Sequence, residues 1–529
     1  MKKGLPVVLI VLDGFGINPQ KEGNAIEAAK KPNFDDWFRH YPWLLAEAAE
    51  QSVGLNWGEV GNSEVGHTTI GSGQIIYQNL PRINIAIEDK SFFKNEALLG
   101  AVEHVRTNNS KLHLVGLVSN GGVHSHIDHL FALLDFLKQQ KIKKNVYLHA
   151  FTDGRDTDPA VADKLITMTL NQMKKTGGGE IASLAGRYFA MDRNNNWPRT
   201  AKVYRCLTRG EGVKVKDPLK AIKDSYAKKV TDEQLEPMVI SGRGDEPLAK
   251  IEAGDAVIFF NFREDRARQL AKAFVVNDFK EFDRGPKINN LFFVTMTEYE
   301  AGLPAVVAWP PQHITKPLAK ILAEAGLKQL HIAETEKYAH VTYFFNGGAE
   351  EPFKNEERVL IPSPDVETYD LKPAMSAKEI TDQVLKEIAK DKYDFIVMNY
   401  ANADMVGHTG KFEATVEAIQ ALDREVKRVV DAVLAKGGAV FITADHGNAE
   451  VKVNILTGDI SKEHTANFVP LFMISTLRAK DISTAEVETK KHSASAQGLL
   501  ADVAPTILDY LGLEPSDEMT GQSLLKYLN

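Results

Sequence analysis

The 529-residue sequence has only one cysteine, Cys206. A single cysteine excludes an intrachain disulfide and a metal site built from thiolates alone. The chain lacks any apolar run of about 18 residues, so we expect no membrane-spanning helix. It also lacks an excess of basic charge, because 63 Lys and Arg face 71 Asp and Glu, for a formal net charge of −8. This balance disfavours nucleic acid or an anionic membrane as a general partner.

We also expect no targeting signal at the N-terminus. The N-terminal apolar run follows two lysines, but it is short and leads into Asp13-Gly14-Phe15-Gly16 instead of a small-residue cleavage site. We interpret the run as a buried strand and expect a cytoplasmic location. Hydrophobic residues make up 43% of the chain and charged residues 25%, which is typical of a folded globular protein and excludes a disordered chain.

Short apolar runs alternate along the chain with longer amphipathic segments. Such runs are typical of strands that are buried on both faces, whereas residues 378–390 and 411–436 have helical patterns with charged faces. The alternation predicts an α/β fold with mostly parallel sheets. The expected strands are 6–12, 112–118, 146–151, 181–185, 256–260, 291–294, 395–398, 439–443 and 470–474.

Polar clusters follow several of these strands directly. In open α/β sheets the carboxyl ends of the strands carry the ligand site, so these clusters are in the right place for chemistry. They are Asp13 and the segments 152–156, 261–263, 399–404 and 445–448.

The polar clusters separate into two kinds along the chain. Asp, His and Ser dominate near both ends, whereas arginine-bearing turns dominate in the middle. The simplest organisation is a domain built from both ends and interrupted by an inserted domain, with loop-like boundaries near residues 78–82 and 305–315. We therefore expect a discontinuous metal-binding domain at 1–79 and 312–529, and a substrate-binding domain at 80–311.

A carboxylate and an imidazole occur together twice in the C-terminal part. Asp404 and His408 are four residues apart and would share one face of a helix, and Asp445 and His446 are adjacent. Each residue alone could be a turn residue or an ordinary polar side chain, but several at strand ends favour a metal site. Mixed carboxylate and imidazole ligands suit Mn²⁺, Zn²⁺, Fe²⁺ or Co²⁺ better than Ca²⁺. Two further candidates would complete two adjacent sites: Asp13 and His464.

Ser63 lies in the glycine-rich segment Gly61-Asn62-Ser63-Glu64-Val65-Gly66-His67. Val65 stands where a G-x-S-x-G elbow requires glycine, so a Ser–His–Asp triad is not favoured. A serine beside a divalent cation can instead react as a stabilised alkoxide. From this segment alone, an ordinary surface turn explains the serine equally well.

Ten segments form a recognisable series from residue 11 to residue 470. They are VLDGFG (11–16), GNSEVGH (61–67), SNGGVHSH (119–126), TDGRDTDP (152–159), GRYFAMDR (186–193), NFREDRARQL (261–270), ETEKYAHVTYFFNGG (334–348), NYANADMVGHTG (399–410), TADHGNAE (443–450) and HTANFVP (464–470). In this order they resemble the cofactor-independent phosphoglycerate mutases of the alkaline-phosphatase-like superfamily. Phe468 departs from the proline that many relatives have, but it is no expected ligand.

The resemblance implies an alkaline-phosphatase-like metal domain interrupted by a substrate-binding domain. It also implies interconversion of 3-phosphoglycerate and 2-phosphoglycerate, in glycolysis and gluconeogenesis, by a monomer that needs no 2,3-bisphosphoglycerate. Ser63 would be the nucleophile and become phosphoserine. Two divalent ions, usually Mn²⁺, would be held by these sets: Asp404, His408 and His464 for one, and Asp13, Ser63, Asp445 and His446 for the other.

The resemblance also implies a set of substrate-binding residues. Phosphoglycerate carries a phosphate and a carboxylate, and guanidinium groups match such multi-oxygen anions. Any one of these arginines alone could be an ordinary solvated surface residue. The residues implied are His124, Arg155, Asp156, Arg187, Arg193, Arg263 and Arg266 in the inserted domain, and Lys337 in the metal domain.

Three other functions remain to be weighed. The phosphohistidine type of mutase uses an Arg-His-Gly motif. The comparable string here is Arg39-His40-Tyr41, so the sequence does not support that mechanism. A metal-dependent phosphatase or phosphopentomutase would share the metal residues but need not have the GRYFAMDR and NFREDR segments. A non-enzymatic metal-binding or scaffold protein would be expected to lack a ligand or the nucleophile, and none is missing.

The two boundary segments predict a hinge, because a mutase must exclude water while the phosphoryl group is off the substrate. We expect small-angle X-ray scattering to show a smaller radius of gyration when phosphoglycerate is added. An unchanged radius at saturating substrate would contradict the hinge.

Overall fold

The structure is a computed structural model that describes residues 5–455, 457–476 and 481–528. The chain forms two compact units. The first unit comprises Met1–Gln78 and Gln312–Asn529, and the second comprises Asn79–Pro311. That the first unit binds metal and the second binds substrate remains a prediction.

The first unit contains an eight-stranded mixed sheet in which β1 occupies a central position. β1 pairs in parallel with β13 on one side and β14 on the other, whereas β15 runs antiparallel to both of its neighbours. The strand order across the sheet is β12 (Glu356–Ile361), β11 (Gln329–Glu334), β13 (Phe395–Tyr400), β1 (Val7–Leu12), β14 (Ala439–Thr443), β15 (Val469–Ser475), β2 (Trp43–Glu47) and β16 (Gly498–Leu499).

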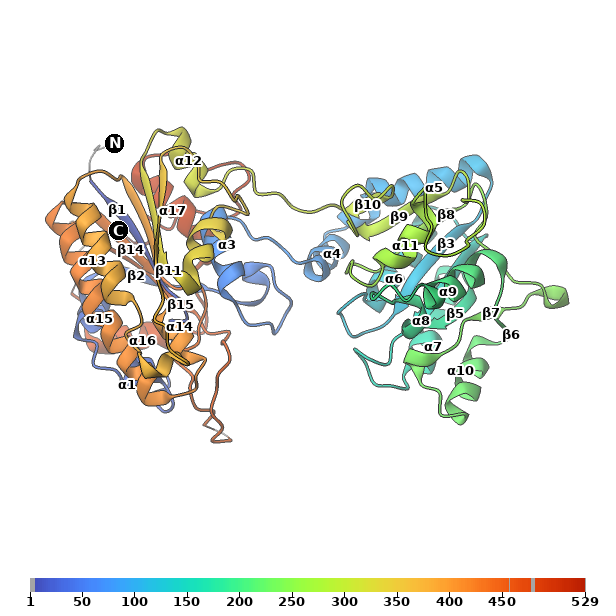
Figure 1. Cartoon of the computed structure of the whole chain (residues 1–529), viewed down its shortest axis with the longest axis horizontal. Coiled ribbons are helices and arrows are strands. Elements are labelled where there is room, and N and C mark those ends of the chain that lie inside the picture. Colours follow the sequence, from blue (N-terminus) through green and yellow to red (C-terminus); the bar gives the residue numbers. More distant parts are fainter. Residues whose placement is uncertain (1–4, 456, 477–480, 529) are drawn as a thin grey trace. The chain divides into compact units, whose positions relative to one another are not determined.

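Helices cover both faces of this sheet (Figure 1). On one face α1, α2 and α13 contact the long helix α15, and on the other α12 and α17 contact α3. α15 buries Leu422, Val426, Val429 and Val433, whose spacing of three or four residues places them on one helix face. The helices of this unit are α1 (Ala25–Ala28), α2 (Pro32–His40), α3 (Ser63–Ser72), α12 (Leu318–Glu324), α13 (Ala377–Ala389), α14 (Asn402–Gly407), α15 (Phe412–Ala435), α16 (Thr484–Lys491) and α17 (Val503–Leu511).

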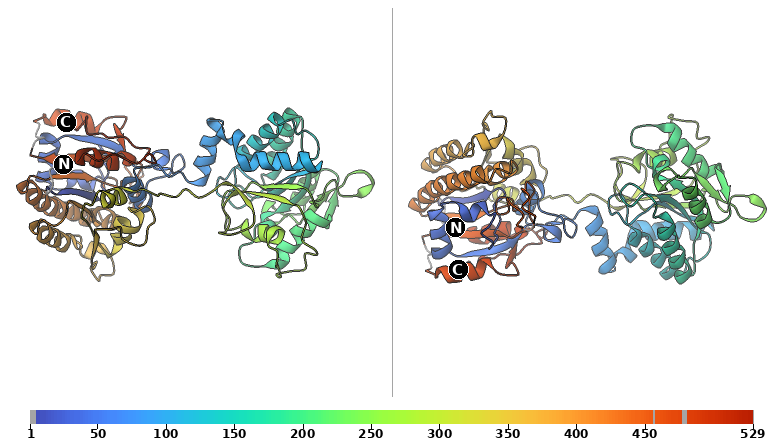
Figure 2. Two further views of the ribbon diagram at one scale, coloured as in Figure 1. Left: turned by 90° about the horizontal axis from the view of Figure 1, so that it is seen from above. Right: turned by 90° about the horizontal axis from the view of Figure 1, so that it is seen from below.

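The second unit is built around its own eight-stranded sheet, with helices on both faces (Figure 2). Side chains of β3 alternate between two cores, with Leu114 in one and Val115 in the other. Its strand order is β10 (Val306–Trp309), β9 (Phe292–Thr297), β8 (Ala256–Phe259), β3 (Leu112–Val118), β4 (Val146–Thr152), β5 (Glu180–Gly186), β7 (Met238–Ile240) and β6 (Val213–Val215). Its helices are α4 (Asn79–Glu88), α5 (Glu96–Asn108), α6 (Ile127–Gln139), α7 (Ala162–Thr176), α8 (Arg187–Ala190), α9 (Trp197–Arg209), α10 (Pro218–Ala227) and α11 (Arg268–Val275).

The α/β fold with mostly parallel sheets is confirmed, and each apolar run expected to be a strand lies on one. The sequence patterns missed seven of the described strands: β2, β6, β7, β10, β11, β12 and β16. β11 was missed because it contains polar residues. His331 donates from Nδ1 to the carbonyl of Val341 at 2.7 Å, and Gln329 Nε2 donates to the carbonyl of Ala319, also at 2.7 Å. Hydrogen bonds of this kind allow polar side chains to be buried at low cost.

Within the described residues, no helix is both long and apolar enough to cross a membrane.

Candidate active site

Three carboxylates meet at the carboxyl edge of the first unit's sheet. Asp13 follows β1, Asp445 follows β14, and Asp404 lies on α14, directly after β13. Because these three parallel strands are neighbours, residues from the two ends of the chain are brought to one place. Asp13 and Asp445 are fully buried and Asp404 is 2% exposed. So much buried negative charge requires cationic partners.

Ser63 stands at the first position of α3, next to these carboxylates. Asn62 caps the helix by accepting a hydrogen bond from the Val65 amide at 3.0 Å. The Ser63 hydroxyl donates to Asp13 Oδ1 at 3.1 Å and lies 3.0 Å from His446 Nε2. The N-terminus of a helix favours negative charge, so α3 supports a serine that becomes anionic.

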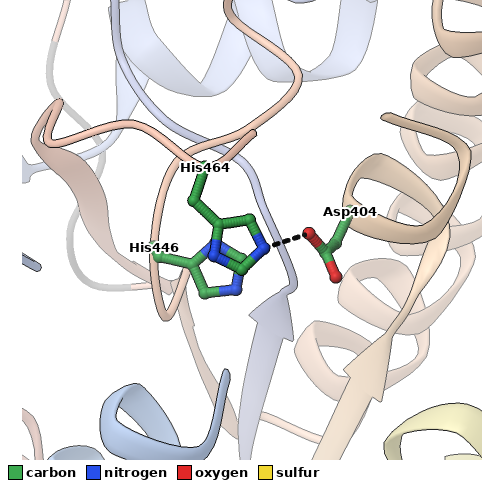
Figure 3. A group of neighbouring side chains, drawn as sticks. All are labelled: Asp404, His446 and His464. Carbon is green, nitrogen blue, oxygen red and sulfur yellow. Dashed lines mark ion pairs between the residues drawn. The ribbon is translucent and has the colours of Figure 1, made fainter. Parts of the chain in front are cut away.

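Three imidazoles surround the carboxylates, and two of them, His408 and His464, are anchored in the same way. Nδ1 of His408 donates to the Lys462 carbonyl at 2.8 Å, and Nδ1 of His464 donates to the Gly61 carbonyl, also at 2.8 Å. Nε2 of both rings therefore faces Asp404 Oδ1, each at 3.1 Å. His446 stacks on His464 (Figure 3), and the ring centroids are 3.9 Å apart. Backbone-anchored rings whose second nitrogens converge are typical of metal ligands.

The arrangement around Ser63 differs from a Ser–His–Asp triad. In a triad the carboxylate accepts from Nδ1 of the histidine whose Nε2 faces the serine. Here Nδ1 of His446 faces the Gly447 carbonyl at 3.3 Å. The carboxylates lie on the Nε2 side, with Asp13 Oδ1 and Asp445 Oδ2 each 3.5 Å from that nitrogen. This geometry favours a shared cation over general-base catalysis by His446.

Lys337 supplies an internal positive charge. It lies in the short turn after β11 and is 3% exposed. Its ammonium group donates at 2.7 Å to each of Asp13 Oδ1, Asp404 Oδ2 and Ser63 Oγ. Burial alone would lower the pKa of Lys337, but the neighbouring carboxylates raise it above its usual value. Lys337 therefore stays protonated at neutral pH.

The residues fit divalent cations. Two sets of ligand atoms lie close enough together to hold an ion: Asp404, His446 and His464, and Asp13, His67 and Asp445. Asp445 Oδ2 is buried and accepts no hydrogen bond from the described part of the chain, because the nearby Nδ1 of His67 donates to the Ser63 carbonyl at 2.8 Å. A buried carboxylate oxygen left without a donor is what a metal ligand requires.

Three supporting residues were not assigned a role of their own from the sequence. Asn399 Nδ2 donates to Asp13 Oδ2 at 2.8 Å, and Asn448 Nδ2 donates to Asp404 Oδ1, also at 2.8 Å. His67 Nδ1 lies 3.2 Å from Asp445 Oδ2, with its Nε2 3.0 Å from Asn399. All three belong to the recognisable segments, and their amide and imidazole groups next to predicted ligands were the available signal.

A second cluster lies at the carboxyl edge of the other sheet, within the second unit. Its residues follow the neighbouring strands β8, β3, β4 and β5. Arg187, which is 2% exposed, donates to Asp153 Oδ1 at 2.6 Å and to Asp156 Oδ2 at 2.5 Å. The Ser119 hydroxyl holds the other oxygen of Asp153 at 2.5 Å. Arg187 is therefore fixed from two sides.

Arg193, Arg263 and His124 surround a single carboxylate, Asp265. Arg266 lies near them and donates to the Met191 carbonyl at 3.1 Å. Burial lowers the pKa of Arg266, and the positive charges of Arg187, Arg193 and Arg155 lower it further. Such mutual repulsion shows that these arginines share one region and would attract an anion.

The expected substrate residues are thus not all brought together by direct contacts. Arg155 is 53% exposed and faces Glu233 at 3.5 Å. Lys337 lies in the first unit, among the carboxylates described above. Asp153 and Asp265 were not assigned a role from the sequence, although both stand within the recognised segments beside arginines.

Two family models match the chain. The model described as BPG-independent PGAM N-terminus matches residues 83–301, and the model for type I phosphodiesterase / nucleotide pyrophosphatase matches residues 284–510. The first covers most of the second unit, and most of the residues matched by the second lie in the C-terminal segment of the first unit.

Close relatives share one name. The 2,3-bisphosphoglycerate-independent phosphoglycerate mutase of Moorella thermoacetica is 49% identical over 520 residues, covering 98% of both chains. That of Clostridium perfringens (strain SM101 / Type A) is 51% identical over 521 residues, covering 98% of this chain and 99% of the relative. A crystal structure of Leishmania mexicana phosphoglycerate mutase has 29% identity and a TM-score of 0.51, covering 98% and 97% of the two chains.

These matches confirm the resemblance drawn from the short segments, and they extend it to nearly the full length of the chain. The chain belongs to the family of 2,3-bisphosphoglycerate-independent phosphoglycerate mutases.

Proposed function

We propose that the chain interconverts 3-phosphoglycerate and 2-phosphoglycerate, with Ser63 carrying the phosphoryl group between the two oxygens. The observation that carries the proposal is the position of Ser63 Oγ, which lies 3.1 Å from Asp13 Oδ1, 3.0 Å from His446 Nε2 and 2.7 Å from Lys337 Nζ. A hydroxyl held between a carboxylate, an imidazole and an ammonium ion is well placed to lose its proton and attack phosphorus.

Two divalent cations complete this proposal. The ligands would be Asp404, His408 and His464 for one ion, and Asp13, Ser63, Asp445 and His446 for the other. Mn²⁺ is the ion that we propose, because the family usually uses it. When bound, the cations would supply positive charge that stabilises the Ser63 oxyanion and the transferring phosphoryl group.

The chain's own residues act in two transfers. In the first, Ser63 Oγ loses its proton and attacks the phosphorus of 3-phosphoglycerate, while Lys337 offsets the negative charge that develops on Oγ. The bond between phosphorus and the 3-oxygen breaks, Ser63 becomes phosphoserine, and the 3-oxygen takes up a proton to give the glycerate hydroxyl. The glycerate stays bound and reorients. In the second, its 2-hydroxyl oxygen attacks the phosphoserine and Ser63 is regenerated. No external phosphate donor is required for this cycle.

The arginine cluster of the second unit would hold the anionic groups of the substrate. Guanidinium groups bind carboxylate and phosphate oxygens in pairs, and they would retain the glycerate between the two transfers. The residues proposed for this role are His124, Arg155, Asp156, Arg187, Arg193, Arg263 and Arg266.

A metal-dependent phosphatase is the second candidate, because the family model that matches residues 284–510 is a phosphodiesterase model. In a phosphatase, water would take the phosphoryl group from Ser63. The arginine cluster favours the mutase, since a hydrolase gains nothing from retaining the dephosphorylated product. An assay coupled to enolase separates the two: 2-phosphoglycerate supports the mutase, and free phosphate in its place supports the phosphatase.

Replacing the nucleophile provides a direct prediction. Ser63→Ala should lower kcat by at least about 10³-fold, because the oxygen that carries the phosphoryl group is removed. Bound metal, measured by elemental analysis, should stay nearly unchanged, since three other ligands remain at that ion. Thr68→Ala on the same helix is the matched control and should retain activity. Substantial turnover by the Ser63→Ala variant would refute the nucleophile assignment.

Metal binding should depend on pH with a definite sign. Burial alone would lower the pKa of His464, but Asp404 raises it above its usual value. The ring therefore keeps its proton to a higher pH, and protons compete with the metal. We therefore expect the apparent Mn²⁺ affinity and the activity to begin falling already above about pH 6.5, the usual pKa of histidine, and to fall further at lower pH. Both should recover when the pH is restored with Mn²⁺ present. Full activity after exhaustive chelation would contradict the metal assignment.

A further inference from the structure

Asp265 is the shared partner of three residues in the second unit's cluster. Arg193 Nη1 donates to Asp265 Oδ2 at 2.8 Å, and Arg263 Nε lies 3.2 Å from Oδ1. Nδ1 of the buried His124 lies 3.5 Å from the same Oδ1. The three residues come from different segments: the loop after β3, the loop after α8 and the loop after β8. Asp265 lies in the loop after β8 itself, so the hydrogen bond from Arg193 joins that loop to the one after α8. Arg263 and His124 lie within ion-pair distance of Oδ1 without donating a hydrogen bond to it.

The two arginines depend on this carboxylate. Arg193 is 48% exposed and Arg263 is 45% exposed, so solvent alone would leave both long side chains in many rotamers. Among the described residues, Asp265 is the carboxylate that lies within ion-pair distance of either guanidinium. Arg187 differs, because it is buried and held by Asp153 and Asp156.

Asp265 remains ionised in this setting. Burial alone would raise the pKa of its carboxyl group, but the hydrogen bond from Arg193 and the positive charge of Arg263 hold the pKa below its usual value. An ionised carboxylate accepts hydrogen bonds at both oxygens and can orient a guanidinium on each side.

We propose that Asp265 is a positioning residue for substrate binding, which pre-organises Arg193, Arg263 and His124 to receive an organic phosphate with a carboxylate. This inference rests on the proposed function of the cluster. The negative charge of Asp265 opposes the binding of any anion, so its benefit must lie in geometry. Pre-organised side chains favour a ligand whose charged groups match their spacing, and give little help to a small ion.

The test compares two ligands in the metal-loaded full-length enzyme. Asp265→Asn should raise KM for 3-phosphoglycerate, and its Kd by calorimetry, at least about tenfold, with a smaller fall in kcat. Inhibition by inorganic phosphate should stay unchanged or become tighter, because a repulsive charge has been removed. Asp265→Glu restores the charge on a longer side chain and should recover part of the loss.

A matched control exists in the same unit. Glu300 also pairs with two cationic side chains, Lys272 at 2.7 Å and Arg268 at 3.7 Å, but outside the cluster. Glu300→Gln should keep KM within about twofold of the unmodified enzyme. Thermal unfolding of every variant identifies any loss of folding. If Asp265→Asn is unstable, KM and phosphate inhibition are compared between Asp265→Glu and the unmodified enzyme instead.

The outcomes separate the inference from the proposed function. If Asp265→Asn keeps the KM for 3-phosphoglycerate within about twofold, the positioning role is wrong even though the enzyme is a mutase. Equal weakening of phosphate inhibition and phosphoglycerate binding also overturns it, because that result indicates general damage to the site. If the unmodified protein binds phosphoglycerate without isomerising it, the proposed function fails while the binding comparison still tests Asp265. If it does not bind phosphoglycerate, both fail.

Discussion

Crowding of like charges in a buried space is the constraint on which the first unit's site depends. Asp13, Asp404 and Asp445 are almost completely removed from solvent, where uncompensated carboxylates are strongly destabilising. The protein supplies the Lys337 ammonium group, three imidazoles whose Nε2 atoms face the carboxylates, and two amide donors. The buried carboxylates make the site costly to fold, and the same negative charge suits it to bind divalent cations. The stability of the first unit and the chemistry of its site therefore depend on the same cluster of carboxylates.

The topology explains why this cluster can form. β1 comes from the N-terminal part of the chain and lies between β13 and β14, which come from the C-terminal part. The residues that follow three adjacent parallel strands meet at one edge, however far apart they are in sequence. A whole second unit can then be inserted between residues 78 and 312 while the first sheet stays intact.

The second unit applies the same principle with the charges reversed. Its arginines repel one another and are held apart and oriented by carboxylates, with Asp153 and Asp156 on Arg187 and Asp265 between Arg193 and Arg263. A cluster that keeps a surplus of guanidinium groups after these pairings is suited to a ligand with more than one anionic group. In both units, opposite charges thus offset most of the buried charge, and the remainder can interact with a ligand.

The sequence by itself determined the expected strands, because strands buried on both faces leave continuous apolar runs that can be recognised without knowing their neighbours. It also identified Asp13, Asp404 and Asp445 as candidates, since chemistry at a strand end leaves polar residues just after an apolar run. Ser63 was assigned as the nucleophile from the family resemblance. Only the tertiary structure revealed β11, whose buried His331 and Gln329 are satisfied by backbone carbonyls from other segments. The partners Asn399, Asn448 and Asp265 likewise became visible only in the structure. Their importance lies in which distant atom each side chain reaches, and that is decided by how loops from separate strands pack, which local sequence does not specify.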